Sequence, residues 1–219
     1  QLQRLQDDLG EDGVVLGRLD RSPFQKLLIE LADPQQFLVD YMTEPGPIET
    51  LLAMLEEKQS RQVDLALDLP VAAVWQPDNV TADMTPPAIF EKYCASFYRK
   101  QGAKLRAANK AYLVHLDGRL APLAPAIAGS TFDVVESFSF AEMGNDLSET
   151  DALQLWPDKV ICPNFPASMS GKSRREIEDY CAAKVQAFGP RPFMLQISED
   201  LPADHYAHVL ESLTGFFSR

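Results

Sequence analysis

Short apolar runs alternate along this chain with longer amphipathic stretches. The apolar runs have the length and composition of buried strands and cover residues 14–19, 71–75, 112–114, 133–135, 160–162 and 193–197. The amphipathic stretches carry apolar residues three and four positions apart, which predicts helices over 22–31, 34–41, 47–58, 86–100, 120–128, 148–155, 173–187 and 204–213. Strands that alternate with helices of this length predict an α/β protein with a parallel sheet and helical crossovers.

The pattern contains six strand–helix units, two fewer than a closed eight-stranded barrel has. Three arrangements stay open at this point. The chain forms a six-stranded open sheet with two free edges, a barrel that lacks its first strands, or a barrel whose first strands come from another chain. We expect one domain over residues 1–219, because the length suits a single sizeable core and no low-complexity linker interrupts it.

Composition narrows the function classes. Hydrophobic residues make up 46% of the chain and the net charge is −12, so we expect a folded acidic protein that binds neither nucleic acid nor anionic membranes by default. No apolar run approaches the roughly 20 residues of a membrane helix. The N-terminus has no secretory pattern, and its first residue, Gln1, is consistent with a processed chain or a piece of a longer one. Three widely spaced cysteines without a CxxC pair favour the reducing cytoplasm.

Chemically capable side chains follow two neighbouring predicted strands. His115-Leu116-Asp117-Gly118 comes directly after the run 112–114, and Glu136 follows the run 133–135. If both runs are adjacent parallel strands, one imidazole and two carboxylates lie at their carboxyl ends, where (β/α) barrels keep their chemistry. Such a group binds a divalent metal or moves protons.

Further polar residues end the other predicted strands and would line the same mouth. They are Asp20, Arg21, Asp78, Asn79, Asn164, Glu199 and Asp200. Several carboxylates around one mouth raise each other's pKa or require a cation, which is the best argument in the sequence for a metal or a cationic ligand.

Several ordered segments together resemble the uroporphyrinogen decarboxylase superfamily. They are Trp75–Val80, Pro87–Tyr93, His115–Gly118, Asp133–Phe138, Met143–Asp146, Trp156–Ile161, Asn164–Pro166 and Ser198–Pro202. The resemblance implies a TIM-type (β/α) barrel of which this chain holds about six of the eight units, the first strands being absent. The superfamily contains tetrapyrrole decarboxylases and methyltransferases that act with corrinoid proteins and thiols.

The resemblance implies different donor sets for these two branches. The decarboxylases hold a polycarboxylate with basic groups and grip its pyrrole NH groups with an early aspartate, a region missing here. The methyltransferases activate a thiol on zinc held by His-x-Cys and a later Cys. His115 matches that histidine, Asp117 replaces the first cysteine, and the second falls near Leu195 or Gln196. Glu136 matches the glutamate of the methionine synthase type. A site of His115, Asp117 and Glu136 would therefore prefer harder divalent ions.

We therefore expect metal-assisted methyl or one-carbon transfer, or a related lyase reaction, on a small, tetrapyrrole-linked or corrinoid-linked substrate. His115, Asp117 and Glu136 would form the metal or acid–base cluster, with zinc as the first guess for the metal, and Glu199 would assist catalysis. The substrate-binding candidates are Arg21, Asp78, Asn79 and Asn164. The alternatives are a decarboxylase of tetrapyrrole biosynthesis completed by the missing strands, and a catalytically silent module whose open side is covered by a partner chain or a second copy.

Simpler interpretations stand beside these. His115 can be a core histidine bonded to Asp117 or Glu136 without a metal. Glu199-Asp200 can be a solvated turn. Cys162 is better explained as a buried structural thiol, and Trp75 as a packing residue.

Overall fold

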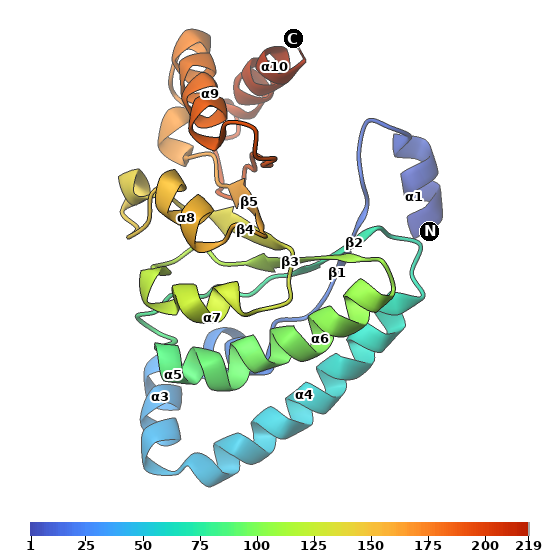
Figure 1. Cartoon of the computed structure of the whole chain (residues 1–219), viewed down its shortest axis with the longest axis vertical. Coiled ribbons are helices and arrows are strands. Elements are labelled where there is room, and N and C mark those ends of the chain that lie inside the picture. Colours follow the sequence, from blue (N-terminus) through green and yellow to red (C-terminus); the bar gives the residue numbers. More distant parts are fainter. Residues whose placement is uncertain (219) are drawn as a thin grey trace.

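One parallel sheet forms the centre of the protein. A computed structural model describes residues 1–218 and shows five strands in the order β1-β2-β3-β4-β5, each parallel to its neighbours (Figure 1). The strands are β1 (Leu16–Arg18), β2 (Ala73–Gln76), β3 (Ala111–His115), β4 (Val134–Phe138) and β5 (Val160–Pro163). Helical segments connect successive strands, so the predicted α/β class and the parallel sheet with helical crossovers are confirmed.

The sixth predicted strand, residues 193–197, is not a regular strand. It meets β5 through two isolated parallel bridges, Ile161 with Phe193 and Asn164 with Gln196. Pro163 lies between these bridges on β5 and has no backbone N–H, which interrupts a regular ladder. Within residues 1–218 the sheet does not close, so its form is that of an incomplete barrel rather than a closed one.

The helices match the predicted pattern, with differences at their ends. They are α1 (Leu2–Leu9), α2 (Pro23–Lys26), η1 (Leu27–Leu31), α3 (Pro34–Thr43), α4 (Pro45–Leu67), α5 (Pro87–Ile89), η2 (Phe90–Ala95), α6 (Ser96–Ala107), η3 (Ala121–Leu123), α7 (Ala124–Ala128), η4 (Ala141–Met143), α8 (Glu149–Leu155), η5 (Ala167–Met169), α9 (Arg174–Phe188) and α10 (Tyr206–Phe217). Among the described residues, no helix combines the length and the apolarity needed to cross a bilayer.

Two predicted helices contain π-helical turns, and three helical segments, α1, η4 and η5, lie outside the predicted helices. The helix over 22–31 consists of α2 followed by the π-helix η1, and the helix over 86–100 passes through the π-helix η2 into α6. Periodicity does not distinguish these wider turns from α-helix, because both leave a continuous apolar face. The N-terminal helix α1 carries Leu2, Leu5 and Leu9 on one face, a helical spacing that the predicted pattern left out, and none of its residues is fully buried.

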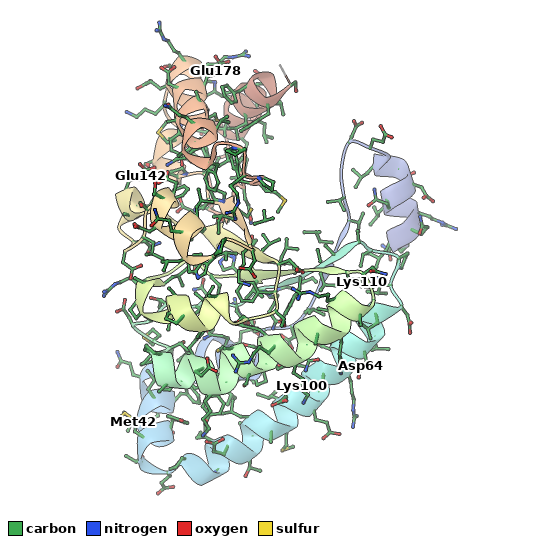
Figure 2. All side chains as sticks on the ribbon, in the orientation of Figure 1. Met42, Asp64, Lys100, Lys110, Glu142 and Glu178 are labelled. Atoms are coloured by element: carbon green, nitrogen blue, oxygen red, sulfur yellow. The ribbon has the colours of Figure 1, made fainter. Side chains whose placement is uncertain are left out.

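Helices α4, α6 and α7 lie together on one side of the sheet (Figure 1). The side chains of Val74, Tyr112, Val114 and Val135 point to that side and are completely buried in the main hydrophobic core. Two surface ion pairs join α4 to α6, Lys100 to Glu56 and Lys104 to Asp64, both at 2.6 Å, and Figure 2 labels Lys100 and Asp64 along this seam.

The opposite face of the sheet is the concave, inner face. Strand alternation places Ala73, Leu113, Val134 and Cys162 there, and these four form a separate buried cluster with Trp75 packed against it. His115 and Glu136 continue the same inward rows toward the carboxyl ends of β3 and β4. The alternation of the two strands therefore aims both side chains at the inside of the incomplete barrel.

Candidate active site

His115 and Glu136 are direct neighbours across β3 and β4. They are partners in the strand register, and His115 Nδ1 lies 2.7 Å from Glu136 Oε2. The same carboxylate oxygen accepts a hydrogen bond from Trp75 Nε1 at 2.8 Å. Glu136 is only 3% exposed. The central sheet thus fixes one carboxylate between an imidazole and an indole N–H.

Asp117 faces the other nitrogen of the same ring. Its Oδ2 lies 3.4 Å from His115 Nε2. The side-chain amide of Asn79, with its nitrogen turned to Asp117, donates to both carboxylate oxygens at 2.9 Å. The structure therefore brings together His115, Asp117, Glu136 and Asn79, four residues that the sequence placed at the ends of three strands.

Gly118 allows the loops after β2 and β3 to meet. Its backbone N–H donates to Val80 O at 3.1 Å. A Cβ added at Gly118 would lie 2.2 Å from Thr81 Cβ and 2.7 Å from Thr81 Cα, distances that no side chain tolerates. The glycine that ends the His-Leu-Asp-Gly segment thus permits the close approach that brings Asn79 to Asp117.

The two carboxylates control the charge of His115. Burial lowers the pKa of His115, but its contacts with Asp117 and Glu136 outweigh this effect and raise the pKa to about 9. At neutral pH the ring is therefore an imidazolium ion with a carboxylate at each nitrogen. Such a group can donate a proton or stabilise negative charge, whereas a general base would need a free ring nitrogen.

Asn164 and Glu199 form a second polar group at the end of β5. Asn164 Nδ2 donates to Glu199 Oε1 at 3.1 Å, Asn164 Oδ1 accepts from the backbone N–H of Ser198, and Glu199 Oε2 accepts from the backbone N–H of Ala167 at 2.7 Å. Ser198 Oγ lies 2.7 Å from Ser137 Oγ, next to Glu136. Ser137 has a φ of 60° at an irregularity in the β4–β5 ladder, so this backbone is strained directly beside the site.

Asp78 and Arg21 are held away from the His115 cluster. Asp78 is completely buried and accepts hydrogen bonds from the backbone N–H of Ser22 at 2.7 Å and from Tyr98 Oη at 2.5 Å. Burial raises the pKa of Asp78, although both hydrogen bonds oppose the effect. Arg21 forms an ion pair with Glu30 at 2.9 Å. The contacts of both residues are structural, and the structure does not bring them to the imidazole.

A cavity of about 360 Å³ lies on the inner face beside Glu136. Its lining consists of Leu16, Trp75, Leu113, Glu136, Cys162, Met194, Leu195 and Gln196. Cys162 is buried, as expected, and burial raises its pKa to about 12, so it remains a thiol. The sequence argument missed Gln196 and the polar role of Trp75. Strand alternation carried a usable signal for Trp75, because it places Ala73 and Trp75 on one face.

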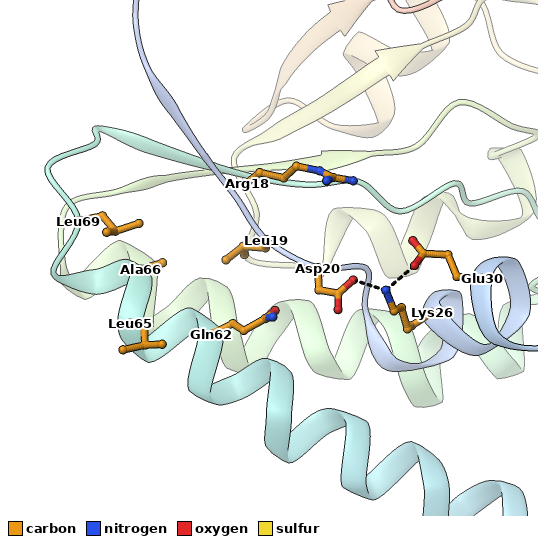
Figure 3. Close-up of a pocket in the computed structure, with 9 residues that line it drawn as sticks. All are labelled: Arg18, Leu19, Asp20, Lys26, Glu30, Gln62, Leu65, Ala66 and Leu69. Atoms are coloured by element: carbon orange, nitrogen blue, oxygen red, sulfur yellow. Dashed lines mark hydrogen bonds and ion pairs between the residues drawn. The ribbon is translucent and has the colours of Figure 1, made fainter. Parts of the chain in front are cut away.

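A larger cavity of about 580 Å³ opens at the edge of β1 (Figure 3). Lys26 lies there between Asp20, at 2.8 Å, and Glu30. Arg18 lines it too, and its guanidinium lies 5.8 Å from the Trp75 ring. None of the four clustered residues lines this hollow. Although it is larger, this cavity is therefore a weaker candidate for the reaction site than the smaller cavity beside Glu136.

The donor set decides which metal the site suits. The donors beside the imidazole are carboxylates rather than thiolates, because Asp117 and Glu136 contact its two nitrogens whereas Cys162 Sγ contacts Gln196 Oε1 at 3.2 Å. Glu136 faces Nδ1, so the predicted ligands do not converge on one point, and residues 1–218 hold no group of three His, Cys, Asp or Glu with metal-binding geometry. His115 Nε2 and Asp117 remain as the two donors on one side of the ring.

No protein-family profile matches this chain, and no curated protein sequence does. Among solved structures, the fold is similar to that of a methyltransferase from Methanosarcina mazei. The two share 13% sequence identity and a TM-score of 0.74 over 99% of this chain and 63% of that one. This chain thus spans less than two thirds of the methyltransferase. The likeness shows that this α/β chain has a fold similar to part of that protein.

Proposed function

We propose that this chain carries the reaction centre of a methyl-transferring enzyme of the uroporphyrinogen decarboxylase superfamily, with a corrinoid as methyl donor and a small acceptor. The observation that carries the proposal is that Asp117 and Glu136 contact the two ring nitrogens of His115 at the carboxyl ends of β3 and β4. This is the end of a parallel sheet at which barrel enzymes work. The fold likeness to a methyltransferase supports the choice of reaction class.

The imidazolium ion has a definite task in such a reaction. A substrate at the mouth meets one cation between two carboxylates, and His115 stabilises negative charge or supplies a proton there. Glu136 and Trp75 fix the plane of the ring, while Asn79 fixes Asp117. Every member of the cluster has its own hydrogen-bond support, so little reorganisation accompanies the reaction.

A metal ion is a separate part of the proposal. The ion would take the place of the proton on His115 Nε2 and would be held there by this nitrogen and Asp117, with Asn79 offering its amide oxygen in the other rotamer. Glu136 would orient the ring through Nδ1. These are harder donors than thiolates. When bound, such an ion supplies Lewis-acid polarisation of an oxygen-containing acceptor.

The decarboxylase alternative has less support in the geometry. A polycarboxylate tetrapyrrole requires free basic side chains at the mouth. Arg21 is paired with Glu30, and Lys26 with Asp20. Arg18 has no carboxylate partner within residues 1–218, and one arginine is too little positive charge for several carboxylates.

The proposal is tested by methyl transfer from methylcobalamin to small thiols, followed by the absorbance change when the cobalt–carbon bond breaks. We expect turnover by the purified protein and its loss in His115→Ala. His208→Ala is the matched control, because His208 lies on α10 and its side chain hydrogen-bonds, within residues 1–218, to the backbone oxygen of Lys172 alone. Elemental analysis of the same samples asks whether a stoichiometric metal depends on His115.

Two results would contradict the proposal. One is turnover in His115→Ala equal to that of the unaltered protein. The other is no methyl transfer with or without added Zn²⁺, Mn²⁺ or Fe²⁺. In the second case, decarboxylation of an added porphyrinogen would favour the lyase alternative, and inactivity in both assays would favour a silent module.

A further inference from the structure

The cavity on the inner face is lined mainly by apolar side chains and by a few polar ones. Five of its lining side chains are apolar or aromatic, namely Leu16, Trp75, Leu113, Met194 and Leu195. The lining residues with carboxylate, thiol or amide side chains are Glu136, Cys162 and Gln196. Its volume of about 360 Å³ suits a small organic molecule. The position of the three polar side chains therefore decides what such a molecule must present.

Glu136 has one oxygen occupied and one open. Oε2 receives both the Trp75 indole N–H and the His115 contact. Oε1 has no hydrogen-bond partner among residues 1–218, although the residue is only 3% exposed. Glu136 lines the mainly apolar cavity, and an unpaired oxygen on a carboxylate that is 3% exposed is costly unless a ligand or water supplies a donor.

Gln196 offers the complementary group. Its Oε1 accepts a hydrogen bond from the thiol of Cys162 at 3.2 Å, which leaves the amide nitrogen on the other side of the group. Its Nε2 donates to no group within the described chain. Cys162 is the register partner of Glu136 on the adjacent strand, so the free acceptor and the free donor lie on either side of one thiol.

We propose that this cavity binds a neutral, mainly apolar compound that carries an amide-type N–H and carbonyl. The N–H donates to Glu136 Oε1 and the carbonyl accepts from Gln196 Nε2. The apolar body packs on Trp75, Leu113 and Leu195. This inference names the class of compound to which the acceptor of the proposed methyl transfer belongs. It rests on that proposal only for the ligand's role as substrate: the methyl group would go to a thiol sulfur elsewhere on the compound, with release of the thiol proton and of Co(I) from the methyl donor.

A neutral ligand fits better than a cationic one. His115 Nδ1, at 2.7 Å, and Trp75 Nε1, at 2.8 Å, already engage one oxygen of the Glu136 carboxylate, so the protein itself offsets part of its charge. A cation in the cavity would meet mostly apolar side chains and would lose its hydration without compensation. A ligand carboxylate is disfavoured for a different reason, because it would face Glu136 itself.

The test uses two probes of nearly the same shape, N-methylbenzamide and methyl benzoate. They differ in that an N–H of the first is an oxygen in the second. Binding is followed by the chemical shift of the Trp75 indole N–H, which donates to the other oxygen of Glu136. Trp156→Phe assigns the two indole signals, because the chain has two tryptophans.

We expect N-methylbenzamide to bind at least about 10-fold more tightly than methyl benzoate, because a hydrogen bond to a charged acceptor contributes about 1.5–3 kcal/mol. Glu136→Gln should reduce this preference to a few-fold. Leu16→Phe, at the edge of the cavity where Leu16 is 40% exposed, should weaken both probes and leave the Glu136 contacts in place. Glu211→Gln, on the exposed surface of α10, should change neither affinity.

Equal affinity for the two probes, or no binding of either, would overturn the inference. So would a preference that Glu136→Gln leaves unchanged. The measurement requires no turnover, so its failure is distinct from the failure of methyl transfer. A protein that transfers methyl groups but does not discriminate the probes would keep the proposed function and lose the proposed acceptor class.

Discussion

Glu136 and Asp78 are two buried carboxylates in very different surroundings. Each is almost completely removed from solvent, and each accepts a hydrogen bond from an aromatic side chain, Trp75 in one case and Tyr98 in the other. Glu136 lies on the concave face, against an imidazolium ion and a cavity. Asp78 lies among helix-side groups with no opening, and burial raises its pKa. Burial and a hydrogen bond from an aromatic side chain are therefore not enough to make a carboxylate part of a functional site.

Glu136 differs from Asp78 in that it has a charged partner on one side and a cavity on the other. His115 supplies Glu136 with a positive charge on one side, while the cavity leaves one oxygen free on the other. Every acceptor position that Asp78 uses is filled by the protein itself, through Ser22 and Tyr98. We expect substitutions around Glu136 to change activity, and substitutions around Asp78 to change stability.

The largest expected effect is that of His115→Ala on the methyl-transfer rate. Loss of a positioned acid or charge-stabilising group typically lowers a rate by 10²–10⁴-fold, so we expect a decrease of at least about 100-fold. The midpoint of urea unfolding, measured alongside, should show that the variant is folded. A decrease of less than about threefold would place the chemistry elsewhere and remove the contrast between the two carboxylates.

Asp78→Ala should cost the most stability. It leaves the Ser22 N–H and the Tyr98 hydroxyl buried without an acceptor, so we expect a loss of about 4 kcal/mol in the free energy of unfolding. Asp78→Asn keeps an acceptor and no charge and should cost about 1 kcal/mol. Asp83→Ala is the matched control, because Asp83 contacts Arg119 at an exposed position. Equal losses for Ala and Asn would show that the hydrogen bonds are not the cause.

The pH dependence of stability separates the two regions further. The folded-state pKa of His115 is about 9, above the usual 6.5 of an unfolded histidine, so its stabilising contribution is complete below pH 6.5 and disappears as the pH rises through 9. We expect unaltered protein in chelator to lose about 2–3 kcal/mol more than His115→Gln between pH 6 and pH 10. Parallel pH profiles for the two proteins would mean that the imidazole is not held as a cation.

The smallest expected effects belong to the aromatic donors. Trp75→Phe removes the N–H that Glu136 accepts, and Tyr98→Phe removes the hydroxyl that Asp78 accepts. Each should cost about 1 kcal/mol of stability. Only Trp75→Phe should lower the methyl-transfer rate, by about tenfold, because it loosens the carboxylate that orients His115. A similar loss of rate in Tyr98→Phe would link Asp78 to the reaction.

Much of the fold was readable from periodicity. Five of the six predicted strands occur as strands within a few residues of their predicted bounds, because buried parallel strands are short continuous apolar runs. The sixth, 193–197, has the right composition but pairs only through two bridges. Whether a ladder forms depends on a neighbour such as Pro163, which lies 30 residues away in the sequence and is invisible to local pattern.

The candidate site was predictable to a similar degree. A chain that places His115 and Glu136 at the ends of consecutive parallel strands makes them neighbours, whatever the loops do. Asp78 and Asn79 are adjacent in sequence and were given the same role. The backbone directs the Asp78 side chain into the core and the Asn79 side chain to Asp117. A shift of one residue after the strand would exchange these two directions.

The amino-acid sequence by itself determined the alternation of strands and helices, the charge, and the presence of an imidazole and two carboxylates at one end of the sheet. Tertiary structure alone decided that both nitrogens of His115 face carboxylates and that one oxygen of Glu136 has no hydrogen-bond partner within residues 1–218. It also decided that Trp75 and Gln196 line the same cavity as Glu136. Periodicity encodes which face a side chain is on. The rotamer and the partner depend on packing between segments far apart in the chain, which no local pattern records.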